Sequence, residues 1–122
     1  MYSKESIAIQ QTIQNYFNGI FNGDTMLLLK VFHPNCLLIG DINGQPYFKD
    51  VNQYLMGVKE RKSPSELSEP FRMEILSIEV LGNNAVAKLH VPMLGFNYYD
   101  FLSLSKINSE WVIVNKLFTN VN

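Results

Sequence analysis

The chain has 122 residues, which is enough for one domain and cramped for two. Ten Lys and Arg against eleven Asp and Glu give a formal net charge of −1, without the basic stripe that would neutralise nucleic-acid phosphates. The longest apolar runs hold only a handful of residues, far short of the roughly 20 that span a bilayer. We therefore expect a single domain over residues 1–122 that binds neither nucleic acid nor a membrane.

The N-terminal segment has Glu5 and alternating polar residues where a secretory signal would be continuously apolar. We therefore expect a cytoplasmic protein. The single cysteine, Cys36, excludes an internal disulfide and is expected as a small core residue. His33 and His90 stand far apart, without the Cys, His or Asp spacing of a metal site, so we expect no metal and no cofactor.

Charged residues make up 17% of the chain, against roughly 25% in typical globular domains. The chain also has eight Phe and six Tyr. Few charges and many aromatic rings suggest that part of the surface is covered by a partner or lines a cavity. A homodimer is the simplest explanation.

The first elements in the chain are two predicted helices. An apolar face with a 3.6-residue period predicts the first helix, which Ser3 can cap and Asn22-Gly23 can end. The residues of this face are Ile9, Ile13, Tyr16, Phe17 and Ile20. Asp24 then caps a short helix over residues 25–32, which Pro34 prevents from continuing.

A hairpin and a third helix follow. Residues 36–39 predict a strand, and Asn43-Gly44 is a strong two-residue hairpin signal that returns the chain through Tyr47-Phe48. Asp50 and Gln53 resemble a capping box at the start of the third helix. Its buried face is predicted to consist of Val51, Tyr54, Leu55 and Val58.

After a loop over residues 62–70, the hydrophobic period changes from 3.6 to 2. Four antiparallel strands are predicted over residues 72–81, 85–93, 98–107 and 111–121, separated by turns at Gly82-Asn83, Gly95 and Asn108-Ser109. Helices followed by a strand meander indicate an α+β fold, with the three helices packed on one face of the sheet.

The register of the last two strands predicts which residues face the helices. A two-residue turn pairs Ile107 with Glu110, and regular alternation then pairs Leu104 with Ile113, Leu102 with Asn115, and Asp100 with Leu117. If Trp111, Ile113 and Leu117 face inward, Lys116 points away. The preceding strand would turn Ala87, Leu89, Val91 and Met93 inward.

The outer face of the sheet is apolar in the same scheme. Its predicted residues are Val86, Tyr99, Phe101, Val112, Val114 and Phe118, with His90 beside them. A sheet that is apolar on both faces needs two covers. The helices supply one, and a second copy of the chain is expected to supply the other.

Four segments together resemble a known family. They are Tyr16-Phe-Asn-Gly-Ile-Phe-Asn-Gly-Asp24, Phe32-His-Pro-Asn35, Asp100-Phe-Leu-Ser-Leu104 and Glu110-Trp-Val-Ile-Val-Asn-Lys-Leu-Phe118. The chain resembles the lumazine-binding family of the nuclear-transport-factor-2-like (NTF2-like) superfamily, beside SnoaL-like cyclases and steroid delta-isomerases. The resemblance implies a cystatin-like cone, in which a strongly bent sheet wraps its first helix incompletely and leaves a mostly apolar pocket.

The resemblance also points to a pair of residues. Tyr16 and Asp100 occupy positions similar to the tyrosine and the protonated aspartic acid of the ketosteroid isomerase oxyanion hole. Apolar neighbours such as Leu102 would raise the pKa of Asp100, and both groups would donate hydrogen bonds to a ligand carbonyl or enolate. Alternatively, the two side chains hydrogen-bond each other or the backbone in a core that needs no substrate.

The general base of those isomerases has no counterpart here. The corresponding position is Gly40, and the adjacent Asp41 would point to the other face of the strand and is expected as a turn residue. His33 is expected to satisfy carbonyls at a helix end, and His90 to lie at a dimer contact. Without a base, proton transfer lacks half of its machinery.

Three hypotheses therefore stand. The first is a domain that binds a small apolar or aromatic ligand through Tyr16, Tyr54, Asp100, Leu102, Trp111 and Asn115. The second is an isomerase, dehydratase or cyclase that uses Tyr16 and Asp100 for electrophilic stabilisation. The third is a dimerisation module whose vestigial pocket is plugged by Phe17, Phe32 and Tyr54. Since NTF2-like folds host many unrelated functions, the family by itself does not decide between them.

Overall fold

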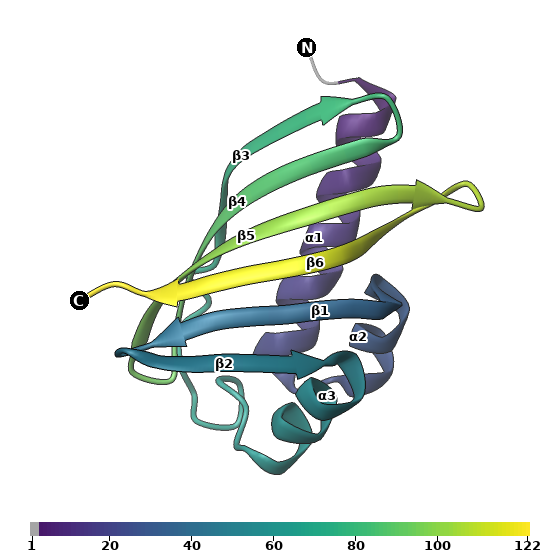
Figure 1. The fold of residues 1–122 in the computed structure, drawn as a ribbon. Helices are drawn as coiled ribbons and strands as arrows, with labels where there is room; N and C mark the ends of the chain where they lie inside the picture. The colour runs from purple at the N-terminus through teal and green to yellow at the C-terminus, as the bar shows by residue number, and fades with distance from the viewer. Residues whose placement is uncertain (1–2) are drawn as a thin grey trace.

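The computed structural model describes residues 3–122. Its elements are α1 (Lys4–Asn22), α2 (Thr25–Val31), β1 (Phe32–Ile42), β2 (Gln45–Asp50), α3 (Val51–Glu60), β3 (Glu74–Leu81), β4 (Asn84–Met93), β5 (Phe96–Ile107) and β6 (Glu110–Asn120). The six strands form one curved sheet in the order β2-β1-β6-β5-β4-β3, with α1 across one of its faces (Figure 1). The predicted α+β fold, with helices on one side of a bent sheet, is confirmed.

Helix boundaries follow the caps expected from the sequence. Ser3 Oγ accepts a hydrogen bond from the Ser6 amide at 3.0 Å, and Gly23 ends α1 with φ of 66°. Asp24 caps α2, and Asp50 and Gln53 form a reciprocal capping box at α3. These contacts are local in sequence, which is why residue types alone could predict them.

The sheet departs from the expected one at β1. This strand begins at Phe32, directly after α2, and pairs with β6 in parallel, whereas the other neighbouring strands are antiparallel. The hairpin to β2 turns at Asn43 and Gly44, both with positive φ, and the Asp41 carboxylate accepts the Gly44 amide at 2.7 Å. Asp41 thus lies near the end of β1 rather than in the turn, and its side chain stabilises the hairpin turn as a hydrogen-bond acceptor.

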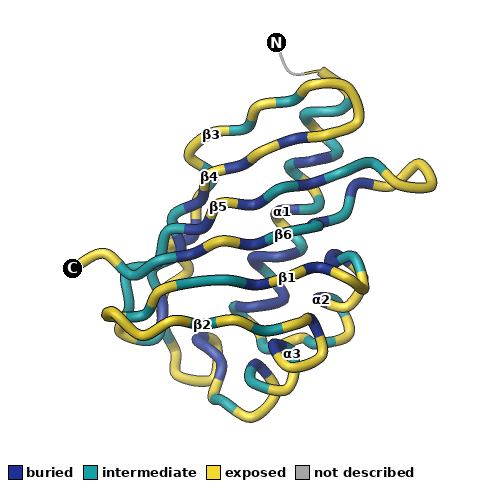
Figure 2. Tube along the Cα trace, viewed as in Figure 1, coloured by how far each residue is buried: buried dark blue, intermediate teal, exposed yellow. Residues whose placement is uncertain are grey.

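The core lies between α1 and the concave side of the sheet (Figure 2). The five predicted residues of the α1 face are all buried, as are the four inward residues predicted on β4. Phe17 and Phe32 pack against the ring of Tyr16, and Phe32 also packs against Tyr54. Aromatic rings therefore fill much of the space beneath the sheet.

The predicted facing of β6 is wrong beyond Ile113. Leu104 pairs with Ile113 as expected, but Ser103 pairs with Asn115, so Val114 is an extra residue in a β-bulge. The bulge moves Lys116 and Phe118 to the buried face, opposite Leu102 and Asp100. Leu117, which was expected inside, is 47% exposed.

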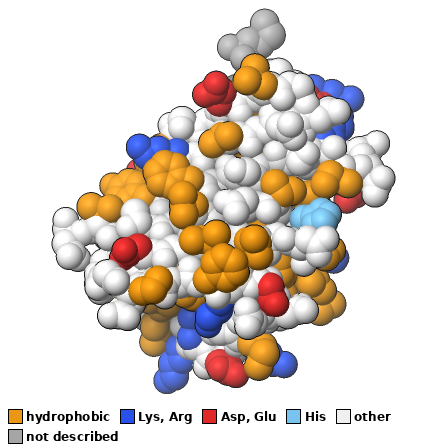
Figure 3. All heavy atoms as spheres, viewed as in Figure 1, with side chains coloured by type: hydrophobic (Ala, Val, Ile, Leu, Met, Phe, Trp, Pro, Cys, Tyr) orange, Lys and Arg blue, Asp and Glu red, His pale blue; other side chains and the backbone are white. Residues whose placement is uncertain are grey.

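The outer face of the sheet carries no helix of the described chain (Figure 1). Exposed apolar side chains on it include Val86, Phe101 and Leu117, and hydrophobic groups gather over the strands in the space-filling view (Figure 3). Phe118 was expected on this face and instead lies inside. With that exception, the predicted apolar character of the outer face is confirmed.

Candidate functional site

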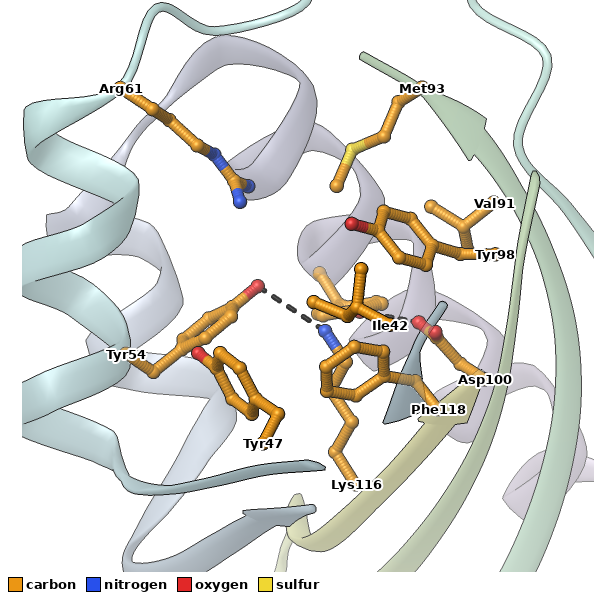
Figure 4. Close-up of a pocket in the computed structure, with 11 residues that line it drawn as sticks. Ile42, Tyr47, Tyr54, Arg61, Val91, Met93, Tyr98, Asp100, Lys116 and Phe118 are labelled. Atoms are coloured by element: carbon orange, nitrogen blue, oxygen red, sulfur yellow. Dashed lines mark hydrogen bonds between the residues drawn. The ribbon is translucent and has the colours of Figure 1, made fainter. Parts of the chain in front are cut away.

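A small, partly enclosed pocket opens between α3 and the inner face of the sheet, beside α1 (Figure 4). Its volume is about 50 Å³, room for a few water-sized groups. The residues that line it are Tyr16, Ile42, Tyr47, Tyr54, Arg61, Val91, Met93, Tyr98, Asp100, Lys116 and Phe118. Four tyrosines, two cations and one carboxylate therefore converge on a space with otherwise apolar walls.

Tyr16 and Asp100 meet at the inner wall of this pocket. The Tyr16 hydroxyl donates a hydrogen bond of 2.5 Å to Asp100 Oδ2, and both side chains are almost wholly buried. This is the arrangement in which the two groups hydrogen-bond each other, rather than the one in which both donate to a ligand. The pair still lies at the pocket wall, so a ligand can contact it.

Burial sets the protonation of the pair. Removal from water raises the pKa of Asp100, although the nearby Lys116 ammonium and the Tyr16 hydrogen bond act in the opposite direction. Burial and the neighbouring Asp100 raise the pKa of Tyr16 well above its ordinary value. Tyr16 therefore keeps its proton and is the donor of the pair.

Lys116 enters the pocket from β6. Its side chain is buried, and its ammonium lies over the rings of Tyr54, Phe118 and Tyr16 at 4.7, 5.0 and 5.1 Å. Its hydrogen bond to the Tyr54 hydroxyl is long, at 3.4 Å. Cation–π attraction offsets part of the cost of burying this charge, but no carboxylate among residues 3–122 lies within salt-bridge distance of it.

Arg61 enters from the opposite side, at the residue that follows α3 (Figure 4). Its Nη2 atom is buried and has no hydrogen-bond partner among the described residues. A guanidinium stays charged at any physiological pH, so this nitrogen is an unused, positively charged donor.

Phenol groups complete the polar lining. Tyr47 and Tyr98 each pack nearly perpendicular to the Phe118 ring, and Tyr54 lies beside Lys116. Burial raises the pKa of Tyr47 to about 12 and also raises that of Tyr98. The Tyr47 and Tyr98 hydroxyls are therefore neutral near pH 7 and can donate hydrogen bonds.

The six residues predicted to bind a ligand are only partly brought together. Tyr16, Tyr54 and Asp100 line the pocket. Leu102 is fully buried outside the lining, and Asn115 lies beyond it, next to the bulge. Trp111 lies toward the start of α1, where its indole donates to Glu5 Oε2 at 2.8 Å, so it belongs to a different part of the core.

Sequence reasoning missed several lining residues for different reasons. Tyr98 could have been found, because it lies two residues before Asp100 on the same strand and alternation puts both on one face. Lys116 and Phe118 could not, because a bulge reversed their facing. Arg61 lies at the C-terminal end of α3, and its direction depends on tertiary packing.

The other candidates lie outside the pocket. His33 Nδ1 accepts the Asn35 amide, and His90 stacks on Tyr99 and contacts Asn97. Cys36 is fully buried, and burial raises its pKa to about 11. Residues 3–122 contain no cluster of His, Cys, Asp or Glu that could hold a metal ion. No helix in this part of the chain is long and apolar enough to cross a membrane.

A curved sheet that encloses a pocket against its first helix defines the NTF2-like class of proteins. Comparison with protein families makes the assignment specific. Residues 4–119 match the family described as "Putative lumazine-binding", and the chain belongs to this family. The predicted membership is thus confirmed. A comparison with curated proteins finds no significant match.

Solved structures agree with the fold. An NTF2-like protein from Shewanella baltica is similar with a TM-score of 0.87 and 21% identity, over 100% of this chain and 98% of that one. A second, from Silicibacter pomeroyi, has a TM-score of 0.82 and 20% identity, over 99% and 100% of the two chains. A third, from Methylobacillus flagellatus, has a TM-score of 0.81 and 20% identity, over 99% and 96%. All three are described as proteins of unknown function, so they establish the fold and no activity.

Proposed function

We propose that the chain is a single small-molecule-binding domain whose ligand enters the pocket between α3 and the sheet. The observation that carries this proposal is the convergence of Tyr16, Asp100, Lys116 and Arg61 on one cavity between aromatic rings. Pockets with apolar walls and a few oriented polar groups are typical ligand sites. Membership of the lumazine-binding family is consistent with this function.

The volume of the pocket limits what it can hold. About 50 Å³ is far below the roughly 300–1,000 Å³ of pockets that enclose a drug-sized molecule. We therefore expect only one end of the ligand to enter the cavity, with any apolar or aromatic remainder at its opening. The rings of Tyr47, Tyr54 and Tyr98 provide surfaces for such a remainder.

A bound molecule can be tested on protein purified in volatile buffer. Native mass spectrometry should detect an adduct that is released on denaturation, and Val91→Phe should abolish it because Val91 lines the cavity. Val86→Phe is the matched control, since Val86 lies on the same strand but is 56% exposed on the other face. Retention of the adduct by Val91→Phe would contradict binding in this pocket. If no adduct co-purifies, an NMR screen of small fragments takes its place. A screen in which no fragment shifts the amide signals of the pocket residues would also contradict binding in this pocket.

Catalysis of the isomerase, dehydratase or cyclase type is the second candidate. Its support is a buried carboxyl with a raised pKa at a pocket wall, a combination that is enriched at active sites. Asp100 accepts from Tyr16 in the structure, so an oxyanion-stabilising role requires Asp100 to be protonated and to turn toward the substrate. Binding ranks first because neither a second carboxylate nor a histidine lines this cavity among the described residues.

The third candidate is a dimerisation module with a vestigial pocket, and the small cavity volume is the observation in its favour. The unpartnered cation of Arg61 argues against it, because a disused cavity gains nothing from such a group. A homodimer through the outer face of the sheet is compatible with all three functions. The cytoplasmic location expected from the sequence stays a prediction.

A further inference from the structure

Two cations face the pocket, and no carboxylate among residues 3–122 lies within salt-bridge distance of either. Lys116 has three N–H donors and makes, among residues 3–122, only its long contact with the Tyr54 hydroxyl. Arg61 Nη2 has no partner in the same part of the chain. Buried donors without partners are rare in proteins, and charged ones are the most costly.

The remaining groups do not neutralise these charges. Asp100 is the one carboxylate among the lining residues, and Tyr16 already donates to it. The other polar lining groups are the Tyr47, Tyr54 and Tyr98 hydroxyls, which can donate hydrogen bonds. Two cations against one carboxylate leave the pocket with net positive charge and an excess of donors.

The size of the cavity restricts the group that satisfies these donors. At about 50 Å³, and with roughly 10–15 Å³ for each water-sized group, the cavity takes about four non-hydrogen atoms. A carboxylate with its attached carbon has this size and is planar, which suits a space between aromatic rings. Inorganic phosphate has five non-hydrogen atoms and is tetrahedral, so it fits this space less well.

We propose that this pocket is a carboxylate site, in which Arg61 and Lys116 bind the carboxylate of a small monoacid or the acid end group of a larger ligand. Hydrogen bonds from both cations to carboxylate oxygens are charge-assisted and therefore among the stronger ones in proteins. This inference rests on the proposed function and makes it more specific, because it predicts an anionic end on the ligand. The apolar ligand expected from the sequence is revised accordingly to one with an acidic group.

The test is an NMR titration of the whole chain at constant ionic strength. Sodium acetate should give saturable shifts of the Tyr54, Asp100 and Lys116 amides, and acetamide, its neutral isostere, should bind at least about tenfold more weakly. Arg61→Gln and Lys116→Gln should each weaken acetate binding by about tenfold or more. Lys59→Gln is the matched control, because it removes an exposed charge from α3, two residues before Arg61, and Lys59 does not line the pocket.

Two further probe pairs separate this inference from the proposed function. If benzamide shifts the pocket amides as strongly as benzoate, the domain binds small molecules but the carboxylate site is overturned. If inorganic phosphate binds more tightly than acetate, the carboxylate assignment is also overturned. Absence of any acetate or benzoate shift overturns it as well, while the co-purification experiment still decides the proposed function. Should Lys116→Gln fail to fold, Arg61→Gln, at the end of a helix, carries the test alone.

Discussion

The Asp100 carboxyl is 2% exposed and is subject to opposing influences. Burial disfavours its charged form, whereas the Lys116 ammonium and the Tyr16 hydrogen bond favour it. Burial is the largest of the three, so the pKa of Asp100 in the folded protein lies above its unfolded value, which is about 3.9. The protonated form is therefore relatively stabilised by folding.

This direction predicts how stability depends on pH. The stabilisation of the folded state that comes from protonated Asp100 is fully present below about pH 4. It is lost as pH rises through the pKa of Asp100 in the folded protein, and the free energy of unfolding falls by at most about 1.4 kcal/mol per pH unit. The unfolding free energy of the wild type relative to Asp100→Asn should therefore fall as pH rises from 4 toward 7. Urea denaturation at several pH values measures the difference. A difference that rises with pH would mean that Lys116 and Tyr16 outweigh burial.

At the scale of elements, the pocket depends on how closely β1 approaches β6. Gly40 on β1 pairs with Phe118 on β6, and a Cβ at Gly40 would stand 2.4–2.6 Å from carbons of the Phe118 ring. Phe118 packs in turn against Tyr47 and Tyr98 at the pocket wall. The glycine is thus required by a close contact rather than by its backbone conformation.

Gly40→Ala should destabilise the fold by about 1–3 kcal/mol, as overpacking of a filled core does. It should also shift the amides of Tyr47 and Tyr98, because Phe118 must move. Gly57→Ala is the control, since a Cβ at this position would meet nothing within 4 Å. The substitution also replaces a glycine inside α3 with a better helix former. Its expected effect is a gain of about 1 kcal/mol. If Gly40→Ala is as stable as the wild type in urea denaturation, the close contact between Gly40 and Phe118 is not required, because β1 and β6 can move apart at no cost in stability.

At the scale of the whole molecule, the sheet has one face packed on the helices and one face free of them (Figure 1). Val86, Phe101 and Leu117 on the free face are 56%, 41% and 47% exposed. Contiguous apolar surface on a sheet favours association, which supports the homodimer expected from the sequence.

Sedimentation velocity tests this expectation. The wild type should sediment as a dimer, and the double variant Val86→Glu/Phe101→Glu should sediment as a monomer, because charges would be buried in the interface. Met26→Glu is the control, as Met26 is 70% exposed on α2, and no helix of the described chain lies on the outer face of the sheet (Figure 1). A monomeric wild type at micromolar concentration would refute the dimer, while binding in the pocket would remain open to its own tests.

The sequence by itself determined those features whose causes lie within a few residues. Caps at Ser3, Asp24 and Asp50, the Asn43-Gly44 hairpin and the apolar face of α1 follow from local hydrogen bonding and periodicity. The family resemblance added Tyr16 and Asp100, which the structure does bring together.

Only the tertiary structure decided the chemical character of the pocket. The sequence around Val112 to Val114 gives no sign that the side chains of this strand stop alternating between the two faces. In the structure, β6 pairs with β5 on one side and in parallel with β1 on the other, and its pairing with β5 contains a bulge. One extra residue reverses the facing of everything after it, because side chains alternate with period two. That reversal turns Lys116 inward and Asn115 away, and packing of α3 then adds Arg61 to the same cavity.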